Sequence, residues 1–576
     1  MIGNERNAGD THECDVLVVG SGAAGMSAAI TARSRGLDVL IVEKEPRFGG
    51  TTARSGGWLW IPGTSLARAY GIEETPDQAR TYLRHEAGNN YDAARVDAFL
   101  SAGPEAVDFF TTKTALRFDM PLVFPDYHAE APGGVQGGRS MVTRPFDGRE
   151  LGDHIKTLGS PLPELTVFGM MLGSGKEIIH FMRATKSLTS AIYVAKRLSR
   201  HLMDVLRYGR GMTLTNGNAL AGRLRKSALD LNIPMWLSSP VRELTIEDGA
   251  VTGAIIARDG RNVRVRARCG VVLACGGFPH DVARRRKMFP HAPTGAEHYS
   301  PGPTGNTGDG LRLAETAGGR IEDRLPNAAA WVPVSLTKRK DGSSGVMPHF
   351  IDRAKPGVIA VMRDGNRFAN EGNSYHDFVQ AMMKAAKPGE EIAAFLICDH
   401  KTLRKYGLGC VPPFPMPLGH HLRTGYLMRG DTLEALAAQA GIDAKGLVAT
   451  VAQFNATAAQ GHDAFGKGSK AYNRYQGDAL HGPNPCVAPV AQGPFYAIKM
   501  VIGDLGTYAG IVTDANARAL DAEGRVIPGL YAAGNDMASV MGGNYPGAGI
   551  TLGPALTFGY IAGRHLAESA VERSAA

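Results

Sequence analysis

The feature that most constrains the fold is a glycine-rich turn between a short apolar strand and a helix. Residues 15–43 carry the pattern strand, glycine turn, alanine-rich helix, second strand and acid. The turn itself has the spacing G-x-G-x-x-G, formed by Gly20, Gly22 and Gly25, and Glu43 is the acid that ends the second strand. This combination predicts a Rossmann-like unit that binds a dinucleotide.

Each glycine of this unit, like its acid, has a distinct physical role. Gly20 permits the tight turn, Gly22 lets the backbone approach a pyrophosphate, and Gly25 lets the helix pack closely on the strand. The helix N-terminus supplies N–H donors and a positive dipole for phosphate. Glu43 is placed to accept hydrogen bonds from ribose hydroxyls.

A second glycine-rich segment, residues 47–57, follows the acid directly and favours FAD over a nicotinamide cofactor. A flat isoalloxazine ring needs small residues that let the backbone pack against it. No second G-x-G-x-x-G unit is found, so a built-in NAD(P)H site is not expected. The residues expected to bind FAD are Gly20, Ser21, Gly22, Ala24, Gly25, Glu43, Lys44, Gly50, Thr51, Thr52, Ser55, Gly56, Gly57, Val241, Gly276, Asp309, Asn535 and Leu552.

The chain of 576 residues is long enough for several domains. Apolar strands near 270–274 and 526–535 return the chain to the nucleotide sheet. We therefore expect an α/β fold with a discontinuous FAD-binding domain, 1–290 and 491–576, and an inserted α+β substrate domain, 291–490. Residues 151–212 form a separate helical insertion within the first part.

Composition narrows the function classes. The six cysteines include no C-x-x-C pair, which argues against zinc, an iron–sulfur cluster or a disulfide framework and fits a reducing cytosol. No metal-ligand motif appears, and basic residues are not interleaved with aromatics as in a nucleic-acid module. The first 13 residues lack the layout of a signal peptide, so we expect a cytoplasmic protein.

Two segments raise the question of a membrane. Residues 537–563 carry no charge, but seven glycines and two prolines make a buried loop and helix the better interpretation. Residues 176–210 interleave apolar side chains with basic ones, and the hypotheses are peripheral contact with the inner membrane face or a solvated helical hairpin. The basic residues are Lys176, Arg183, Lys186, Lys196, Arg197, Arg200, Arg207 and Arg210.

Six segments together resemble the fumarate reductase/3-ketosteroid dehydrogenase superfamily of flavoproteins. They are GSGAAG, GGTTARSGG, NTGDG, PGVIAVMRDGNRFANE, GDLGT and VIPGLYAAGN, and the resemblance covers nearly the whole chain outside 151–212. The fumarate branch uses an H-G-x-x-R element, but residues 543–549 read GNYPGAG without His or Arg. Thr52 stands near the position of that branch's covalent-flavin histidine, so non-covalent FAD is expected.

The 3-ketosteroid Δ1-dehydrogenase branch is more similar. The resemblance implies that Tyr545 and the Gly549 N–H hold the substrate ketone, that Tyr375 is the base, and that Tyr127 assists it. Tyr375 would take a proton from carbon 2 while carbon 1 gives hydride to flavin N5. An external acceptor, quinone-like or artificial, would then reoxidise the flavin. The family commonly has two adjacent tyrosines at the assisting position, whereas here His128 follows Tyr127.

Other interpretations stay open from the sequence. With 17 tyrosines in the chain, any one of them is more often a packing residue than a catalytic one. The protein could be a flavin dehydrogenase or ene-reductase on another ketosteroid or enone, including a 4-ene-forming enzyme, which the His128 departure would suit. It could also be a membrane-associated flavoprotein without efficient turnover.

Overall fold

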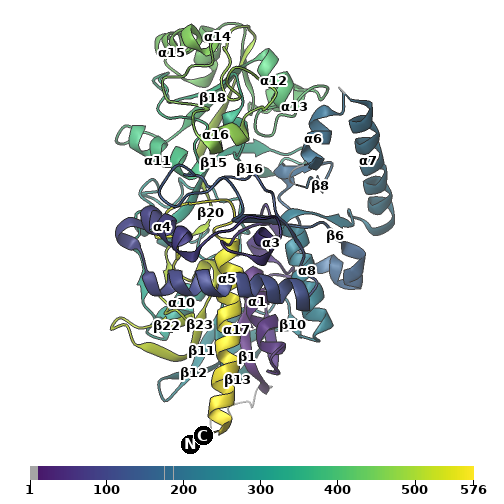
Figure 1. Cartoon of the computed structure of the whole chain (residues 1–576), viewed down its shortest axis with the longest axis vertical. Coiled ribbons are helices and arrows are strands. Elements are labelled where there is room, and N and C mark those ends of the chain that lie inside the picture. The colour runs from purple at the N-terminus through teal and green to yellow at the C-terminus, as the bar shows by residue number, and fades with distance from the viewer. Residues whose placement is uncertain (1–10, 174–175, 186, 576) are drawn as a thin grey trace, which may run out of the picture.

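A computed structural model describes residues 11–575 except 174–175 and 186. Two sheets lie one above the other along the long axis of the molecule (Figure 1). The architecture is mixed α/β with a nucleotide-type sheet below and a second sheet above, which confirms the predicted fold class. The predictions made for residues 1–10 and for Lys186 lie outside the described residues.

The lower sheet contains eight strands, and its parallel centre is built from β1, β2 and β13. Strand β23 pairs in parallel with β13, so the chain returns to this sheet near its end. The strands are β10 (Met235–Trp236), β2 (Val39–Val42), β1 (Thr11–Val19), β13 (Arg261–Leu273), β12 (Ala250–Arg258), β11 (Val241–Glu247), β22 (Arg518–Leu520) and β23 (Val526–Ala532).

Helices cover the parallel centre of this sheet, and its strands are correspondingly apolar. All four residues of β2 are buried, because a parallel strand between helical layers has no solvated face. The long C-terminal helix α17 (Leu552–Ala575) packs along α1 (Ala23–Arg33), with α5 (Ala93–Lys113) beside it (Figure 1). Helix α8 (Asn216–Asp230) also packs on α1.

Glycines make the contact between α1 and α17 close. A Cβ at Gly559 would lie 2.4 Å from the Ala24 carbonyl oxygen, and one at Gly563 would lie 2.5 Å from that of Ala28. The uncharged run 537–563 is therefore a buried loop followed by the first half of α17. Among the described residues, no helix is long and apolar enough to cross a membrane.

The upper sheet forms the core of the inserted domain. Its strands, in spatial order, are β16 (Ser344–Pro348), β15 (Ala329–Lys338), β20 (Phe495–Thr507), β18 (Ala394–Asp399) and β17 (Val358–Val361), with β19 (Met428–Gly430) also on β20. The predicted domain boundary at 490 is wrong in detail, since β20 belongs to this sheet and runs to Thr507. The pattern missed it because a buried strand carries no signal for which sheet it joins.

Helices pack around the upper sheet and hold the segments that run from it toward the lower sheet. They are α11 (Tyr375–Ala385), α12 (His400–Tyr406), α13 (Gly419–Arg423), α14 (Leu433–Ala440), α15 (Ala444–Ala458) and α16 (Ala471–Gln476), whereas α10 (Asp309–Thr316) packs on β11 of the lower sheet. Helix α11 packs on β15, and its first residue is Tyr375. Figure 1 shows α11 at the side of the upper unit.

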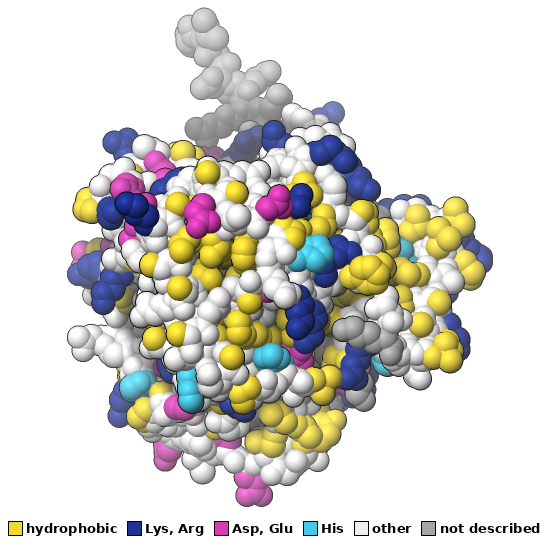
Figure 2. Space-filling view, turned by 90° about the horizontal axis from the view of Figure 1, so that it is seen from above, with side chains coloured by type: hydrophobic (Ala, Val, Ile, Leu, Met, Phe, Trp, Pro, Cys, Tyr) yellow, Lys and Arg dark blue, Asp and Glu magenta, His cyan; other side chains and the backbone are white. Residues whose placement is uncertain are grey.

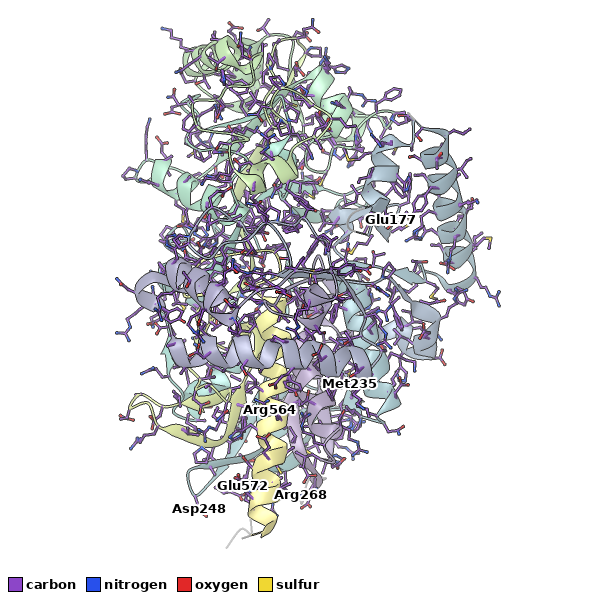
Figure 3. The ribbon with its side chains drawn as sticks, viewed as in Figure 1. Glu177, Met235, Asp248, Arg268, Arg564 and Glu572 are labelled. Atoms are coloured by element: carbon purple, nitrogen blue, oxygen red, sulfur yellow. The ribbon has the colours of Figure 1, made fainter. Side chains whose placement is uncertain are left out.

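The insertion 151–212 forms an arm at the side of the molecule. Helices α6 (Lys176–Arg183) and α7 (Leu188–Tyr208) pack against each other and stand away from both sheets (Figure 1). Glu177 belongs to α6 and is labelled in Figure 3, where it lies between α7 and the body of the molecule. Its carboxylate pairs with the Arg197 guanidinium of α7 at 2.7 Å. The six cysteines are free, and the described residues contain no cluster of side chains that could hold a metal ion.

Candidate active site

A cavity lies where β1 turns into α1. Fifteen of the eighteen residues predicted to bind FAD line it: Gly20, Ser21, Gly22, Ala24, Glu43, Lys44, Gly50, Thr51, Thr52, Ser55, Val241, Gly276, Asp309, Asn535 and Leu552. The N-terminus of α1 opens onto this space, which suits an anionic pyrophosphate. No atom lies within 4 Å of where a Gly50 Cβ would stand, as expected for a position kept open for a flat ligand.

The other three predicted residues pack the walls of the site and do not line the cavity. A Cβ at Gly25 would lie 2.1 Å from the Gly20 carbonyl oxygen, so glycine is needed there for helix–strand packing. Gly57 has a φ of +67° and lies against the backbone of Asn216. Gly56 lies against the Trp58 ring. Their glycine signal came from close protein contacts.

Hydrogen bonds and an ion pair within the protein hold the glycine-rich turn at Gly20 in its conformation. Glu43 accepts hydrogen bonds from the Ser21 hydroxyl at 2.6 Å and from the Ser21 N–H at 3.1 Å. Burial raises the pKa of Glu43, and these hydrogen bonds oppose the rise. Thr52 accepts from the first N–H of α1, that of Ala23, at 2.9 Å, while Lys44 pairs with Asp309 at 2.5 Å. The acid, the turn and the second glycine segment therefore act as one unit.

Several residues of the cavity were missed by the sequence analysis. Asp536 does not line the cavity itself, but it is buried and accepts from the N–H groups of Cys275, which does line it, and of Gly277. Its motif neighbour Asn535 was the only visible signal for it. The further lining residues are Val19, Ala23, Val42, Glu45, Ser239, Pro240, Ala274, Cys275, Pro303, Gly305, Asn306, Leu313, Leu505, Gly534, Thr551 and Ala555.

The three tyrosines singled out in the sequence meet in one buried cluster. The Tyr127 hydroxyl donates to the Tyr375 hydroxyl at 2.9 Å, although the two residues lie 248 positions apart. The Tyr545 ring stacks on Tyr127 at 5.4 Å and meets Tyr375 edge-on at 4.9 Å. The exposed fraction of each side chain is at most 5%, so the hydroxyls are shielded from bulk water.

The turn 545–549 joins this cluster to the cavity. Gly549 has a φ of +100°, and a Cβ there would lie 2.5 Å from the Trp58 carbonyl oxygen. Its own carbonyl accepts from the Trp60 N–H at 3.1 Å, but its N–H has no acceptor in the described part of the chain. Three residues later Leu552 lines the cavity and begins α17. A substrate between the tyrosines and the cavity would therefore meet a ready N–H donor.

Burial sets the protonation of the cluster. It raises the pKa of Tyr127 and Tyr375 well above the ordinary value near 10, and that of Tyr545 to about 12. All three are phenols at neutral pH, so each can donate a hydrogen bond to a ketone or to a neighbour. A phenolate at Tyr375 would therefore need stabilisation by neighbouring groups.

Two further residues at the cluster carried no sequence signal. Tyr472, on α16, packs against Tyr127 with ring centroids 4.2 Å apart. Arg353 is fully buried and donates to the Glu371 carbonyl at 2.7 Å. Burial raises the pKa of Tyr472, and the charge of Arg353 opposes the rise. Long-range proximity of this kind cannot be read from spacing along the chain.

His128 points away from the hydroxyl pair. Its two ring nitrogens contact Glu86 at 2.9 Å and Asp377 at 2.7 Å. Tyr127, rather than His128, therefore stands at the hydroxyl of Tyr375. Burial works against a charge on His128, but hydrogen bonds with Asp377 and Glu86 raise its pKa to about 10.

Comparisons with known proteins agree with this geometry. A family model described as an FAD binding domain matches residues 15–552. The chain is 46% identical over 565 residues to 4-oxocyclohex-2-ene-1-carboxylate 5-dehydrogenase of Sinomonas cyclohexanicum, covering 98% of this chain and 95% of that protein. It is 38% identical over 575 residues to 3-oxosteroid 1-dehydrogenase of Mycobacterium tuberculosis, covering 97% and 99%.

A solved structure is similar over the same length. The 3-ketosteroid Δ1-dehydrogenase of Sterolibacterium denitrificans, in complex with 1,4-androstadiene-3,17-dione, superimposes with a TM-score of 0.89 at 38% identity, covering 97% of this chain and all of that one. Fold, cavity and matches define an FAD-dependent oxidoreductase that acts on CH–CH groups. The chain belongs to the FAD binding domain family that includes the 3-oxosteroid dehydrogenases.

The turn at Gly20 yields a direct prediction about FAD. A Cβ at Gly20, where φ is +111°, would lie 2.1 Å from the Ala274 carbonyl oxygen. We expect Gly20→Ala to displace the turn and abolish the flavin absorbance near 450 nm of the purified protein. Gly36→Ala is the matched control, because its φ is +93° but no atom lies within 4 Å of the added Cβ. Full flavin content in Gly20→Ala would contradict the prediction.

Proposed function

We propose that this protein dehydrogenates the ring carbons beside a cyclic ketone, as a 3-ketosteroid Δ1-dehydrogenase does. The observation that carries the proposal is the buried hydroxyl pair of Tyr127 and Tyr375 next to the Tyr545–Gly549 turn. This arrangement offers a base, a group that assists it and two donors for one oxygen. All of them lie beside the turn that leads into the cofactor cavity.

The first requirement is to increase the acidity of the C–H beside the substrate ketone. A C–H beside a ketone loses its proton when the carbonyl oxygen accepts hydrogen bonds that strengthen as an enolate forms. The Tyr545 hydroxyl and the Gly549 N–H are assigned this role. One such preorganised donor contributes about 3–4 kcal/mol to the transition state.

The second task is to accept the proton. Tyr375 takes it from carbon 2, and Tyr127 stabilises the developing charge on the Tyr375 oxygen through its hydrogen bond. General base catalysis of this kind contributes roughly 10²–10⁴-fold. FAD bound in the cavity without a covalent bond would supply the hydride acceptor for carbon 1 and the route of the electrons to an external, quinone-like or artificial acceptor.

The charges around the cluster favour an uncharged substrate. The cations nearest the tyrosines already have partners: Arg353 donates to backbone carbonyls, and His128 lies between two carboxylates. A substrate carboxylate would have to compete with these contacts. A ketone on an apolar ring system would not.

The surface above the cluster is apolar as well. Leu122, Val123, Ile351 and Tyr475 are exposed by 45–70%. Aromatic rings beside these side chains contact one another. The ring centroids of Tyr475 and Phe124 lie 4.7 Å apart, and those of Phe350, which precedes Ile351 in the chain, and Tyr375 lie 5.5 Å apart. A rim of this type fits entry of a sterol-sized molecule.

A second candidate substrate is a monocyclic oxocyclohexane carboxylate. It is favoured by the relative from Sinomonas cyclohexanicum, which is more similar to this chain than the steroid dehydrogenases reported above. Both candidates share the ketone and the bond to be oxidised. They differ in the carboxylate and in the number of rings.

A substrate panel decides between them. The purified holoenzyme is mixed with a 4-ene-3-ketosteroid or with 4-oxocyclohex-2-ene-1-carboxylate, the compound in that relative's name, and an artificial electron acceptor. We expect flavin bleaching and acceptor reduction with the steroid, at a kcat/KM at least tenfold above that for the carboxylate. Turnover of the carboxylate alone would overturn the steroid assignment, and bleaching by neither compound would overturn the function.

The role of Tyr375 gives a second prediction. We expect Tyr375→Phe to lower kcat by roughly 10²–10⁴-fold while the protein keeps its flavin, because only the proton acceptor is removed. Tyr406→Phe is the control, since its hydroxyl contacts Asp478 in the upper domain. Loss of flavin from Tyr375→Phe would assign this residue a packing role instead.

We further propose that the arm 176–210 contacts an anionic lipid surface. Figure 2 shows it projecting from the body with apolar and basic side chains on its outside. Arg183, Lys196, Arg200 and Arg207 are exposed there, whereas Arg197 and Arg210 are used in contacts within the arm and at its base. The exposed large apolar residues of the arm are Ile179, Met182, Leu188, Ile192, Tyr193, Leu202, Met203, Val205, Leu206 and Tyr208.

Vesicle co-sedimentation tests this surface. The protein should bind vesicles rich in phosphatidylglycerol, and the double variant Leu202→Asp/Leu206→Asp should bind at least tenfold more weakly, because it removes apolar contact and adds negative charge. Leu480→Asp/Val571→Asp makes the same change at exposed apolar positions outside the arm. Equal binding by both double variants would contradict lipid contact through the arm.

A further inference from the structure

We propose that His128 is a positioning residue that holds Tyr127 against Tyr375 by bridging Glu86 and Asp377. The inference deepens the proposed function, because it concerns the same hydroxyl pair. His128 itself touches neither the Tyr375 hydroxyl nor the cavity lining.

The bridge connects the elements that must meet at the hydroxyl pair. Glu86 lies on α4 (Pro76–Ala87), and Asp377 lies in the first turn of α11, two residues after Tyr375. His128 follows Tyr127 directly in the chain. A contact of 2.7 Å from His128 to Asp377 therefore fixes the loop of Tyr127 to the helix that begins with Tyr375.

Neutral hydrogen bonds set the same loop from the other side. The Tyr127 N–H donates to the Pro546 carbonyl at 2.9 Å, and the Tyr82 hydroxyl donates to the same oxygen at 2.7 Å. The His128 N–H donates to the Tyr82 hydroxyl at 3.3 Å. These bonds tie the loop to α4 and to the turn of Tyr545, but none of them reaches α11. The His128 side chain supplies that connection.

The bridge depends on the charge of His128. The titratable groups that face it are Glu86 and Tyr82 from α4 and Asp377 and His376 from α11. Burial lowers the pKa of His376 to about 4, so it adds no competing charge at neutral pH. Because the pKa of His128 rises from 6.5 to about 10, its stabilising effect is complete below about pH 6.5 and is lost as the pH rises through about 10.

The test compares His128→Gln with the wild-type holoenzyme. We expect kcat to fall about tenfold or more, with KM changed less than twofold and flavin content unchanged. The difference in melting temperature between the two proteins should shrink as the pH approaches 10. A crystal structure of the variant should show the Tyr127–Tyr375 hydroxyl distance lengthened from 2.9 Å to beyond 3.5 Å.

A second variant separates positioning from general damage. His128→Gln/Asp377→Asn removes one of the carboxylates that the single variant leaves without its cation. We expect the two changes to be non-additive in kcat, as for residues in direct contact. His400→Gln is the control, because that histidine contacts the Tyr496 hydroxyl on the far side of the upper sheet.

The possible failures are distinct. An unchanged kcat in His128→Gln, additive effects in the double variant, or an unchanged hydroxyl distance would overturn the positioning role. A wild-type enzyme that oxidises neither ketone would overturn the proposed function, while the melting profile and the crystal structure would still report on the bridge.

Discussion

Close backbone contact at the end of β1 is the constraint on which the rest of the site depends. A Cβ at Gly20 would overlap the carbonyl of Ala274, and one at Gly25 would overlap that of Gly20. The same tight packing continues where Gly559 and Gly563 of α17 lie on α1. Since α17 begins three residues after Gly549, the turn expected to bind phosphate and the turn proposed to hold the ketone are connected by one continuous packing contact.

The tyrosine cluster has the opposite logic, because it is assembled from distant parts of the chain. Tyr127, Tyr375, Tyr472 and Tyr545 lie on a loop, two helices of the inserted domain and the C-terminal turn. Excluding water strengthens the hydrogen bonds between them and also makes ionisation costly. A site of this kind stays neutral at rest and is suited to form charge only when a substrate oxygen and a proton acceptor are both in place.

The sequence predicts the local parts of this structure and not the distant contacts. The turn at Gly20 is readable because strand, glycine spacing, helix and Glu43 follow one another within 30 residues, and the FAD assignment and α/β class that rest on it are confirmed. The hydrogen bonds of Asp536, the packing of Tyr472 and the bridge at His128 depend on contacts across 42 to 345 positions. The placement of β20 failed for the same reason, since strand pairing is a non-local choice.

Strand β20 links the strand pairing of the upper sheet to the wall of the cofactor cavity. It pairs with β15 and β18 in the upper sheet, yet Leu505 near its end lines the cofactor cavity. Side chains alternate along a strand, so a one-residue slip in its pairing would exchange Leu505 for the buried Asp504 at the cavity wall. The pairing register of β20 in the upper sheet therefore sets which side chain lines the cofactor cavity. Insertions or deletions within 495–504 would change that lining residue.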